Sequence, residues 1–399
     1  MPSTYQLLLN GQAADPDLYT AVASLEVEES LDLPGAMQLD LPVNVTDSGD
    51  LSYVSDPRLQ PFASLAVVVQ PATDSAISGL GALLGGGTGA AGAQCIFDGY
   101  VLSHKLHLDR GTTNSTVAVW GQDASWLMNL EEKTREWLNV TDAEVANSIF
   151  GDYGINPDSG NTDDDSPSHT EDGHSLMQRG SDIQFLRTLA RRNGKICRVA
   201  CADQPGQRTG YFAKPDLSAS PAVTLSLNDP LAWNINSIDL DWDATRPTSV
   251  IARQALFTDN SPDGVSGDTS DSGLALLGDR GLADFTGQSM TVMLAAPVDD
   301  AGELSLRAQA LLRESLWFVK CQGEADLSRL GIVLRAGMIV SLSGAGTLHS
   351  GNYLVWSVRH AIKPDSYTMK FVLVRDAVGA AASGGSGLSG MVGQATSVL

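Results

Sequence analysis

The stretch at residues 158–174 contains the residue types that could most readily carry out chemistry. Asp163, Asp165, His169 and His174 offer carboxylate and imidazole groups, which bind calcium or zinc and act as general acids and bases in hydrolases. Their spacing matches no known metal-binding loop, and the neighbouring Pro, Ser and Gly residues are typical of a solvated loop. We therefore expect no metal site here, and we retain a secreted acidic hydrolase or metal-dependent enzyme as an alternative.

The other reactive side chains are isolated in the sequence. His104 and His107 are three residues apart on a predicted strand, so they point to opposite faces and cannot share a metal. Cys197 and Cys201 have no second pair at zinc-ribbon spacing, and the four cysteines fit reduced, buried thiols. The sequence has no nucleophile elbow, no H-E-x-x-H motif and no phosphate loop. We therefore expect no enzyme, with no catalytic residue, no cofactor and no metal.

The net charge restricts the classes of partner. The 399 residues include 25 Lys and Arg against 47 Asp and Glu, which gives a formal charge of −22. Such a surface repels phosphate groups, so we expect no nucleic acid partner. Ser75–Phe97 and Ala377–Leu399 lack charge, but both are rich in glycine, and we expect no membrane insertion. The N-terminus lacks a basic region and a long apolar run, which predicts synthesis in the bacterial cytoplasm without a signal peptide.

Strand patterns at both ends of the chain surround a section with helical patterns. Thr141 and Glu144 form a capping box that predicts the start of a helix, and Ser181 is placed to cap a second helix that ends at Gly194. The pattern predicts a mainly β fold with α+β insertions, consisting of two β-barrels and a mixed α/β side domain. The predicted segments are a first barrel at 1–123, the side domain at 124–233, a second barrel at 234–257 and 318–376, an insertion with one helix at 258–317, and a flexible Gly/Ser tail at 377–399.

The strand at the start of the closing hairpin gives the clearest alternation. Trp356 and His360 fall on one face of this strand, and Tyr353 falls on the other. One face of a barrel strand fills the core and the other meets neighbours. We therefore expect Trp356 to be core, His360 to be a packed histidine and Tyr353 to be a subunit contact.

Two glycine-rich segments carry large apolar side chains that a permanently solvated loop would not need. Leu80, Leu83 and Leu84 lie in the first segment. Leu388, Met391 and Val392 lie in the C-terminal tail. We expect both groups to be interface residues, the second of them docking onto a partner protein.

The order of several motifs resembles a known family. The most specific piece is Gln178, followed by Ser181-Asp182 and Phe185-Leu186 before a helix that ends at Gly194. The other matching segments are Phe97–Val101, Val117–Asp123, Asp142–Ile149, Ala336-Gly337, Gly344, Gly346, Gly351–Val355, Val358, His360 and Tyr367. This order resembles the phage late control protein D group, the myophage baseplate hub proteins and the N-terminal hub part of VgrG-type spikes. The resemblance covers most of residues 5–376.

The resemblance implies a structural role in a contractile injection system or a phage tail. It implies two tube-protein-like barrels in each subunit and a homotrimer that connects the hexameric inner tube to a trimeric spike. We expect the spike to be a separate chain, so the implied partners are the inner tube protein, a separate spike protein and other baseplate proteins. The implied location is the baseplate end of an assembled particle. A surface adhesin built from β-sandwiches is the second alternative.

Overall fold

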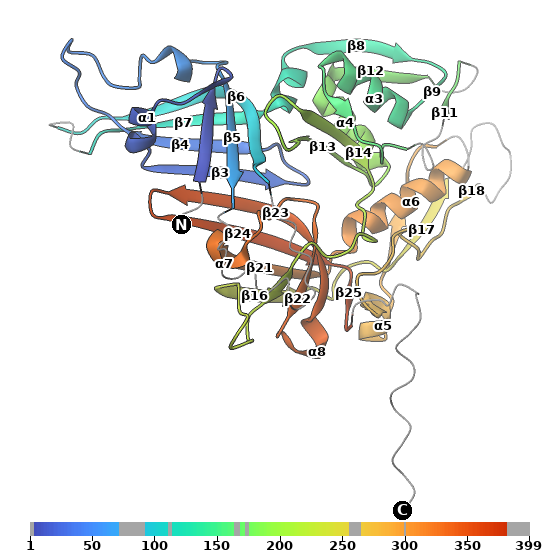
Figure 1. Ribbon diagram of the computed structural model, residues 1–399. Coiled ribbons are helices and arrows are strands. Elements are labelled where there is room, and N and C mark those ends of the chain that lie inside the picture. Colours follow the sequence, from blue (N-terminus) through green and yellow to red (C-terminus); the bar gives the residue numbers. More distant parts are fainter. Residues whose placement is uncertain are drawn as a thin grey trace, which may run out of the picture.

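The computed structural model describes residues 4–71, 92–110, 114–162, 168–171, 175–254, 265–298 and 301–380, and it is mainly β (Figure 1). Most strands belong to one 13-stranded sheet. The remaining strands form small sheets beside it. None of the described helices is both long and apolar enough to cross a membrane.

The N-terminal half of the large sheet is made by residues up to Asp123. Its elements are β1 (Thr4–Leu9), β2 (Gln12–Ala13), α1 (Pro16–Ala21), β3 (Ser24–Ser30), β4 (Ala36–Pro42), η1 (Pro57–Leu59), β5 (Ser64–Gln70), β6 (Gln94–His107) and β7 (Thr116–Asp123). In β3 and β4 every second side chain is buried. This is the alternation that the sequence predicts for strands with one face in a core.

The C-terminal half of the sheet comes from later segments. Its elements are β15 (Thr224–Ser226), β16 (Ser237–Trp242), β21 (Val319–Asp326), α7 (Leu327–Leu330), β22 (Ile339–Ser343), α8 (Gly346–His349), β23 (Gly351–Lys363) and β24 (Ser366–Arg375). The predicted closing hairpin is β23 and β24, which pair antiparallel from Leu354–Val374 to Lys363–Ser366.

The two halves are joined edge to edge by β3 and β23. These strands pair antiparallel from Ser30–Ser357 to Leu25–Ile362, and the sheet order is β16-β21-β24-β23-β3-β4-β7-β6-β5-β1-β2, with β22 between β23 and β15. The predicted two β-barrels are therefore not seen as closed barrels in the described residues, because the 13-stranded sheet runs through both halves. Pairing at this seam satisfies the backbone of two strands that would otherwise be edges.

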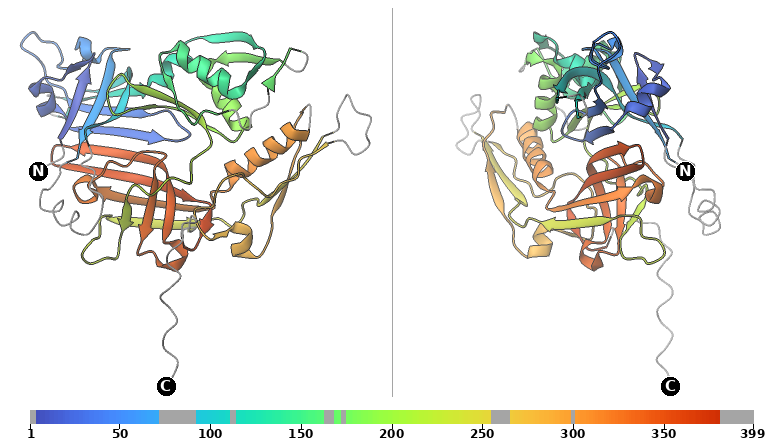
Figure 2. Two further views of the ribbon diagram at one scale, coloured as in Figure 1. Left: turned by 45° about the vertical axis from the view of Figure 1, so that its right-hand side comes forward. Right: turned by 90° about the vertical axis from the view of Figure 1, so that its left-hand side faces the viewer.

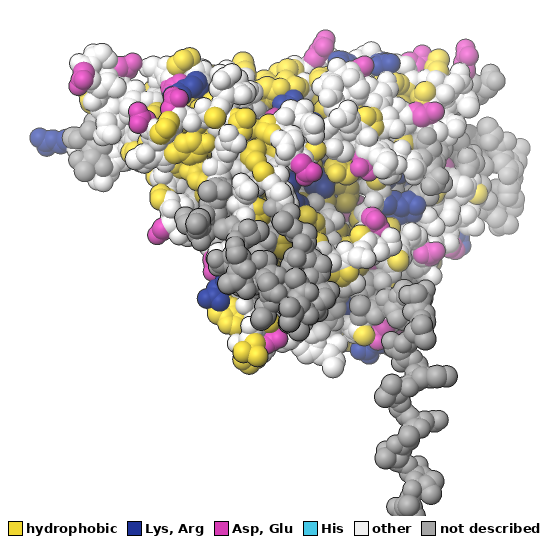
Figure 3. Space-filling model, in the orientation of Figure 1, with side chains coloured by type: hydrophobic (Ala, Val, Ile, Leu, Met, Phe, Trp, Pro, Cys, Tyr) yellow, Lys and Arg dark blue, Asp and Glu magenta, His cyan; other side chains and the backbone are white. Residues whose placement is uncertain are grey.

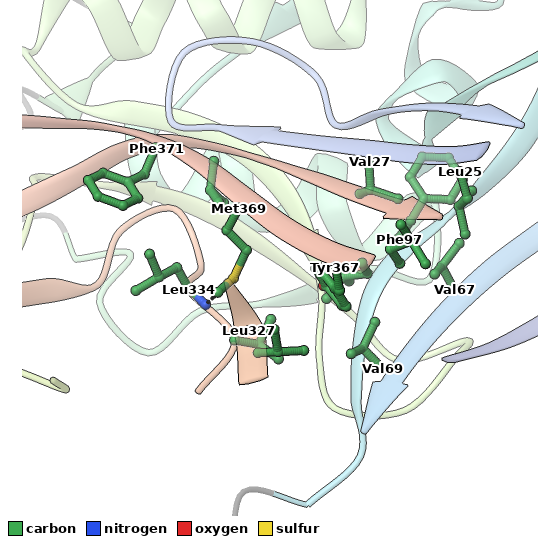
Figure 4. Close-up of a cluster of buried hydrophobic side chains, with 14 of the residues drawn as sticks. Leu25, Val27, Val67, Val69, Phe97, Leu327, Leu334, Tyr367, Met369 and Phe371 are labelled. Atoms are coloured by element: carbon green, nitrogen blue, oxygen red, sulfur yellow. Dashed lines mark hydrogen bonds between the residues drawn. The ribbon is translucent and has the colours of Figure 1, made fainter. Parts of the chain in front are cut away.

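One hydrophobic core runs under both halves. Figure 4 shows Val27 and Phe97 of the N-terminal half close to Tyr367 and Met369 of the C-terminal half, all of them members of the same buried cluster. The seam therefore lies over a shared core and is not a surface contact between two independent units. Figure 2 shows the two halves stacked one above the other, with the helical parts to one side.

The section after β7 forms a mixed α/β unit. Its elements are η2 (Ala124–Asn129), β8 (Glu132–Trp137), β9 (Val140–Thr141), α3 (Asp142–Asp152), β10 (Asn156–Pro157), β11 (Ser168–His169), β12 (Leu176–Ser181), α4 (Asp182–Arg192), β13 (Ile196–Cys201) and β14 (Arg208–Ala213). The predicted capping box is confirmed, since Thr141 and Glu144 each bond the other's backbone N–H. Ser181 sits at the N-cap of α4 but donates to Asn129 Oδ1 at 2.6 Å instead of capping the helix.

A smaller α/β unit lies beside the C-terminal half. It contains β17 (Ser249–Gln254), β18 (Val265–Ser266), β19 (Arg280–Gly281), α5 (Leu282–Thr286), β20 (Thr291–Leu294) and α6 (Ala301–Ser315), and β19 pairs with β25 (Ala377–Val378). We expected β17 to continue the second barrel, but it pairs with β18 and β20 outside the large sheet. The reason is that Val250 and Ala252 pack against Leu304 and Ala308 of α6.

A β-bulge at Trp356 changes which face of β23 is buried. The pairing with β24 steps from Val355 to Ser357, so Trp356 is an extra residue. Before the bulge the odd-numbered Tyr353 faces the core, and after it the even-numbered His360 does so. The predicted core position of Trp356 is therefore wrong, because this side chain is half-buried on the opposite face.

Candidate interaction groove

A groove of about 860 Å³ lies where the large sheet faces α4 and α6. It crosses the seam, because residues of β3 and β23 both contribute to its floor. Its hydrophobic lining includes Leu31, Leu33, Trp242, Trp317, Phe318 and Trp356. Three of the seven tryptophans of the chain therefore face one groove. Such a concentration of tryptophan is typical of surfaces that bind a partner.

Two of these tryptophans lie against each other. The ring centroids of Trp317 and Trp356 are 6.0 Å apart, and Trp356 Nε1 donates to Asp32 Oδ1 at 3.1 Å. Trp242 packs edge-on against Phe285 with 5.8 Å between ring centroids. It remains 52% exposed. The groove therefore presents a fixed aromatic pair and one large aromatic side chain that a partner could cover.

The groove has a different charge balance from the rest of the protein. Six basic and five acidic side chains line it, whereas acidic residues outnumber basic ones almost two to one in the whole chain. Arg187 of α4 is half-buried in the groove, and its Nε has no hydrogen-bond partner among the described residues. The space-filling view shows charges of both signs scattered among hydrophobic side chains over the visible face (Figure 3). The groove is thus a place where an acidic partner would meet little repulsion.

The helical wall of the groove is held rigidly. Arg191 of α4 pairs with Glu314 of α6 at 2.6 Å, and Arg313 Nη1 donates to the carbonyl of Asn193 at 3.0 Å. Gly194, just after α4, has a φ of +60°, and a Cβ on it would lie 2.7 Å from Ala310 Cα. Only glycine fits this backbone conformation and this close approach of the two helices. The prediction that α4 ends at Gly194 thus has a packing reason as well.

A buried polar cluster fixes the seam near the groove floor. Glu29 of β3 accepts hydrogen bonds from Arg335 Nε at 2.7 and 2.9 Å, and His360 Nδ1 lies 2.9 Å from the Tyr367 hydroxyl. Burial would raise the pKa of Glu29, but the charge and hydrogen bonds of Arg335 outweigh it and lower the pKa. Burial lowers the pKa of His360 to about 4. The prediction of a packed His360 is confirmed.

The predicted interface residues do not meet in this groove. Tyr353 is fully buried, and its hydroxyl donates to the His349 carbonyl at 2.7 Å. The expectation of an outward-facing Tyr353 is therefore wrong, because the bulge at Trp356 inverts the side-chain alternation on which it depended. The other predicted contacts lie outside the described residues, namely Leu80, Leu83, Leu84, Leu388, Met391 and Val392.

The acidic stretch is only partly described. Asp163, Asp165 and His174 lie outside the described residues. His169 is buried, and its Nε2 lies 2.7 Å from Asp142 Oδ1 at the start of α3. Asp142 Oδ2 also accepts from Asn193 at 2.6 Å. Burial tends to raise the pKa of Asp142, but the hydrogen bond with His169 and the charge of Arg192 lower it overall. His169 thus helps to join β11 to α3, and Asp142 joins α3 to the end of α4.

Within the described ranges, the reactive side chains do not come together as a metal-binding site. No group of three or more His, Cys, Asp or Glu side chains there could hold a metal ion. His104 and His107 both lie on β6. The sequence reasoning missed the tryptophan groove, although Trp242, Trp317 and Trp356 were visible as residues. Nothing in the pattern indicated that a bulge and two helices would bring them to one surface.

The fold defined by these elements is that of phage tail and type VI secretion proteins. A tail protein from Neisseria meningitidis superposes with a TM-score of 0.62 at 13% identity, covering 94% of this chain and 97% of that protein. The 43 kDa tail protein of prophage MuSo2 from Shewanella oneidensis gives 0.60 at 15% identity, covering 94% and 99%. An Escherichia coli type VI secretion component, described as similar to T4 tail proteins, gives 0.51 at 12% identity, covering 89% and 73%.

At these identities the likeness concerns the fold, and the predicted resemblance to tail and spike proteins is confirmed at that level. The chain belongs to the Alg8 N-terminal domain family, whose sequence model matches residues 88–364. No curated protein sequence matches the chain. The solved proteins named above are described as tail or secretion-system components and not as enzymes.

Proposed function

We propose that this protein is the structural baseplate hub of a contractile injection system or phage tail, of the late control protein D type. In this role it is a homotrimer that connects a hexameric inner tube to a separate trimeric spike. The observation that carries the proposal is the division of the large sheet into two β halves joined at the β3–β23 seam. Three such chains present six β halves, which can match sixfold symmetry on one side and threefold symmetry on the other.

The two halves have the properties that such an adaptor needs. They contain seven and six strands of the 13-stranded sheet, so the two halves are similar in size. The shared core and the buried pair of Glu29 and Arg335 hold them in a fixed relation. A hub that transmits force from tube to spike requires this rigidity. Its mechanism is symmetry adaptation and not bond chemistry.

The groove is the surface that we assign to a neighbouring protein of the particle. Trp242 is exposed in the free chain and would be covered on assembly. Aromatic side chains that become buried at the centre of an interface commonly contribute most of its binding energy.

The test is the oligomeric state of the full chain by native mass spectrometry, alone and with tube and spike proteins from the same organism. We expect a trimer whose class averages in electron microscopy show six β halves in a ring. Trp242→Ala should weaken association at least tenfold if the groove is an interface. Trp233→Ala is the matched control, because Trp233 is also exposed, at 40%, but lies outside the groove. A chain that stays monomeric with both partners present would overturn the proposal.

The enzyme alternative remains testable on the same protein. Its candidate groups are Asp163, Asp165, His169 and His174, of which only His169 lies in the described part of the chain. Replacing all four with alanine should leave trimer formation intact if the protein is a hub. Loss of a hydrolytic activity in this variant would instead support the enzyme. Capture of whole cells by the isolated chain would support the adhesin alternative.

A further inference from the structure

Cys95 and Cys201 lie side by side although they are 106 residues apart in the sequence. Cys95 is near the start of β6 in the large sheet, and Cys201 ends β13 in the neighbouring α/β unit. The Cys201 thiol donates to the Cys95 carbonyl with 2.8 Å between sulfur and oxygen, and the Cys95 amide donates to the Asp203 carbonyl at 3.1 Å. The two backbone segments therefore run alongside each other at this point.

The Cys95 thiol donates to the Phe97 carbonyl with 3.2 Å between sulfur and oxygen, so each thiol lies against the backbone of β6. Hydrogen bonding with the Cys201 thiol, followed by burial, raises the pKa of Cys95. Both cysteines are free thiols. Cys201 is half-buried and Cys95 is fully buried. The Cys201 side of the pair is consequently the one that a small solute can reach first.

A small cavity gives access to Cys201. It has a volume of about 20 Å³ and is lined by Cys201, Glu29, Asp98, Arg198 and Arg208 among others. A cavity of about 10–15 Å³ is enough for one water molecule, so a molecule of about that size could enter. Arg335 Nη2 donates to Cys201 Sγ at 3.4 Å and helps to hold this side chain in place.

We propose that Cys95 and Cys201 form a redox-dependent disulfide that links the N-terminal half of the large sheet to the α/β unit. With hydrogen peroxide as oxidant, the Cys201 sulfur attacks one peroxide oxygen and becomes a sulfenic acid, releasing one water. The Cys95 sulfur then attacks the Cys201 sulfur, and its proton leaves with the hydroxide as a second water. Two thiols are oxidised and one peroxide is reduced to two waters. The inference does not depend on the proposed hub function.

The disulfide would reinforce contacts that already join these two parts. Arg208 Nη2 of β14 pairs with Asp98 Oδ1 of β6 at 2.9 Å, and the Gly206 amide donates to Asp98 Oδ2 at 2.7 Å. These contacts hold the segment around Cys201 against β6. A cross-link over more than 100 residues also removes conformational freedom from the unfolded chain.

The test treats the reduced full-length protein with hydrogen peroxide and counts its free thiols after denaturation. We expect the count to fall from four to two, with a Cys95–Cys201 cross-linked peptide in a non-reducing digest and full recovery after dithiothreitol. The melting temperature of the oxidised form should rise by about 3–6 °C, as the entropy removed over so long a loop predicts for a chain of this size.

Variants distinguish this bond from nonspecific oxidation. In Cys95→Ser the Cys201 sulfenic acid should persist and react with dimedone, because its partner is missing. Cys321→Ser is the matched control, since Cys321 is fully buried elsewhere in the core, and its thiol count should fall from three to one. Four surviving thiols, a Cys197–Cys201 peptide or a disulfide between two molecules in the wild-type protein would each overturn the proposal. The wild-type result alone decides the matter if a variant fails to fold.

Discussion

Glu29 carries its charge at a position that the fold almost closes to solvent. It lies on β3 at the seam, where its carboxylate accepts hydrogen bonds from Arg335 Nε. Its Oε1 also lies 2.6 Å from Arg335 Nη2. A buried ion pair is expensive to break because the remaining charge loses its partner in a region of low polarity. The Glu29–Arg335 pair therefore stabilises the fold only when the two halves are correctly joined.

Glu29→Gln should lower the free energy of unfolding by about 3 kcal/mol, because Arg335 would remain charged and buried without its counter-ion. Urea unfolding followed by tryptophan fluorescence measures this change. Glu26→Gln on the same strand is the control, since its contact with Arg359 is 3.8 Å long and half-exposed, and its effect should stay below about 0.5 kcal/mol. Equal effects of the two substitutions would contradict the role given to Glu29.

His360 should make stability depend on pH. Its pKa in the folded protein is about 4, against an ordinary value of 6.5, because burial disfavours the charged ring. The unfolded chain therefore binds the proton first. The contribution of His360 to stability is complete above pH 6.5 and is lost as the pH falls towards 4, by roughly 3 kcal/mol in total. His360→Gln should remove this contribution, so the variant should gain stability relative to the wild-type protein as the pH falls from 7 to 4.5.

Asp376 changes the free energy of unfolding with pH in the opposite direction, and it serves as the control for His360. Burial raises its pKa to about 6, although the Leu277 amide donates to it. The folded state then binds the proton before the unfolded state does, so this group adds stability as the pH falls through 6. The wild-type curve should be flat where the two effects oppose each other. Asp376→Asn should make it steeper, and an unchanged curve in both variants would refute these assignments.

Elements with a local signal were predictable from the sequence, and the helix at α3 shows this most directly. Thr141 caps the backbone amide of Glu144, and the Glu144 carboxylate accepts from the Thr141 amide. Thr141→Ala should destabilise the protein by about 1 kcal/mol, measured as a shift of the urea midpoint. Thr188→Ala in α4 is the matched control, because the Thr188 hydroxyl bonds only the Gln184 carbonyl one turn earlier. A larger loss at Thr188 would contradict the capping argument.

The elements that were not predictable depend on single insertions or distant partners. The alternation in β3, β23 and β24 identified them as strands, but the extra residue Trp356 inverted the buried face beyond it. No residue type at this position indicates a bulge. The partner of β3 was equally hidden, since the sequence gives no reason to choose β23 over the closing of a barrel. The groove depends on the bulge and on the β3–β23 pairing, so it could not be predicted from the sequence either.

At the scale of the whole molecule, the shared core predicts the order in which the parts unfold. The main cluster contains buried side chains from strands of both halves, whereas the described residues of the unit around α6 and β17 form a cluster of only seven buried side chains. Less buried surface gives a smaller unit less resistance to local opening. We therefore expect the α6 unit to open first and the two β halves to open together.

Hydrogen exchange of the full chain, followed by mass spectrometry of peptides, measures this order. Peptides from β3, β4, β23 and β24 should share one slow exchange rate, because opening the seam exposes the common core. Peptides from β17 and α6 should exchange sooner. Glu29→Gln should accelerate both sides of the seam equally, since Glu29 of β3 holds Arg335 of the other half. Separate slow rates for the N-terminal and C-terminal halves would mean that the two halves open independently, which would contradict a rigid symmetry adaptor.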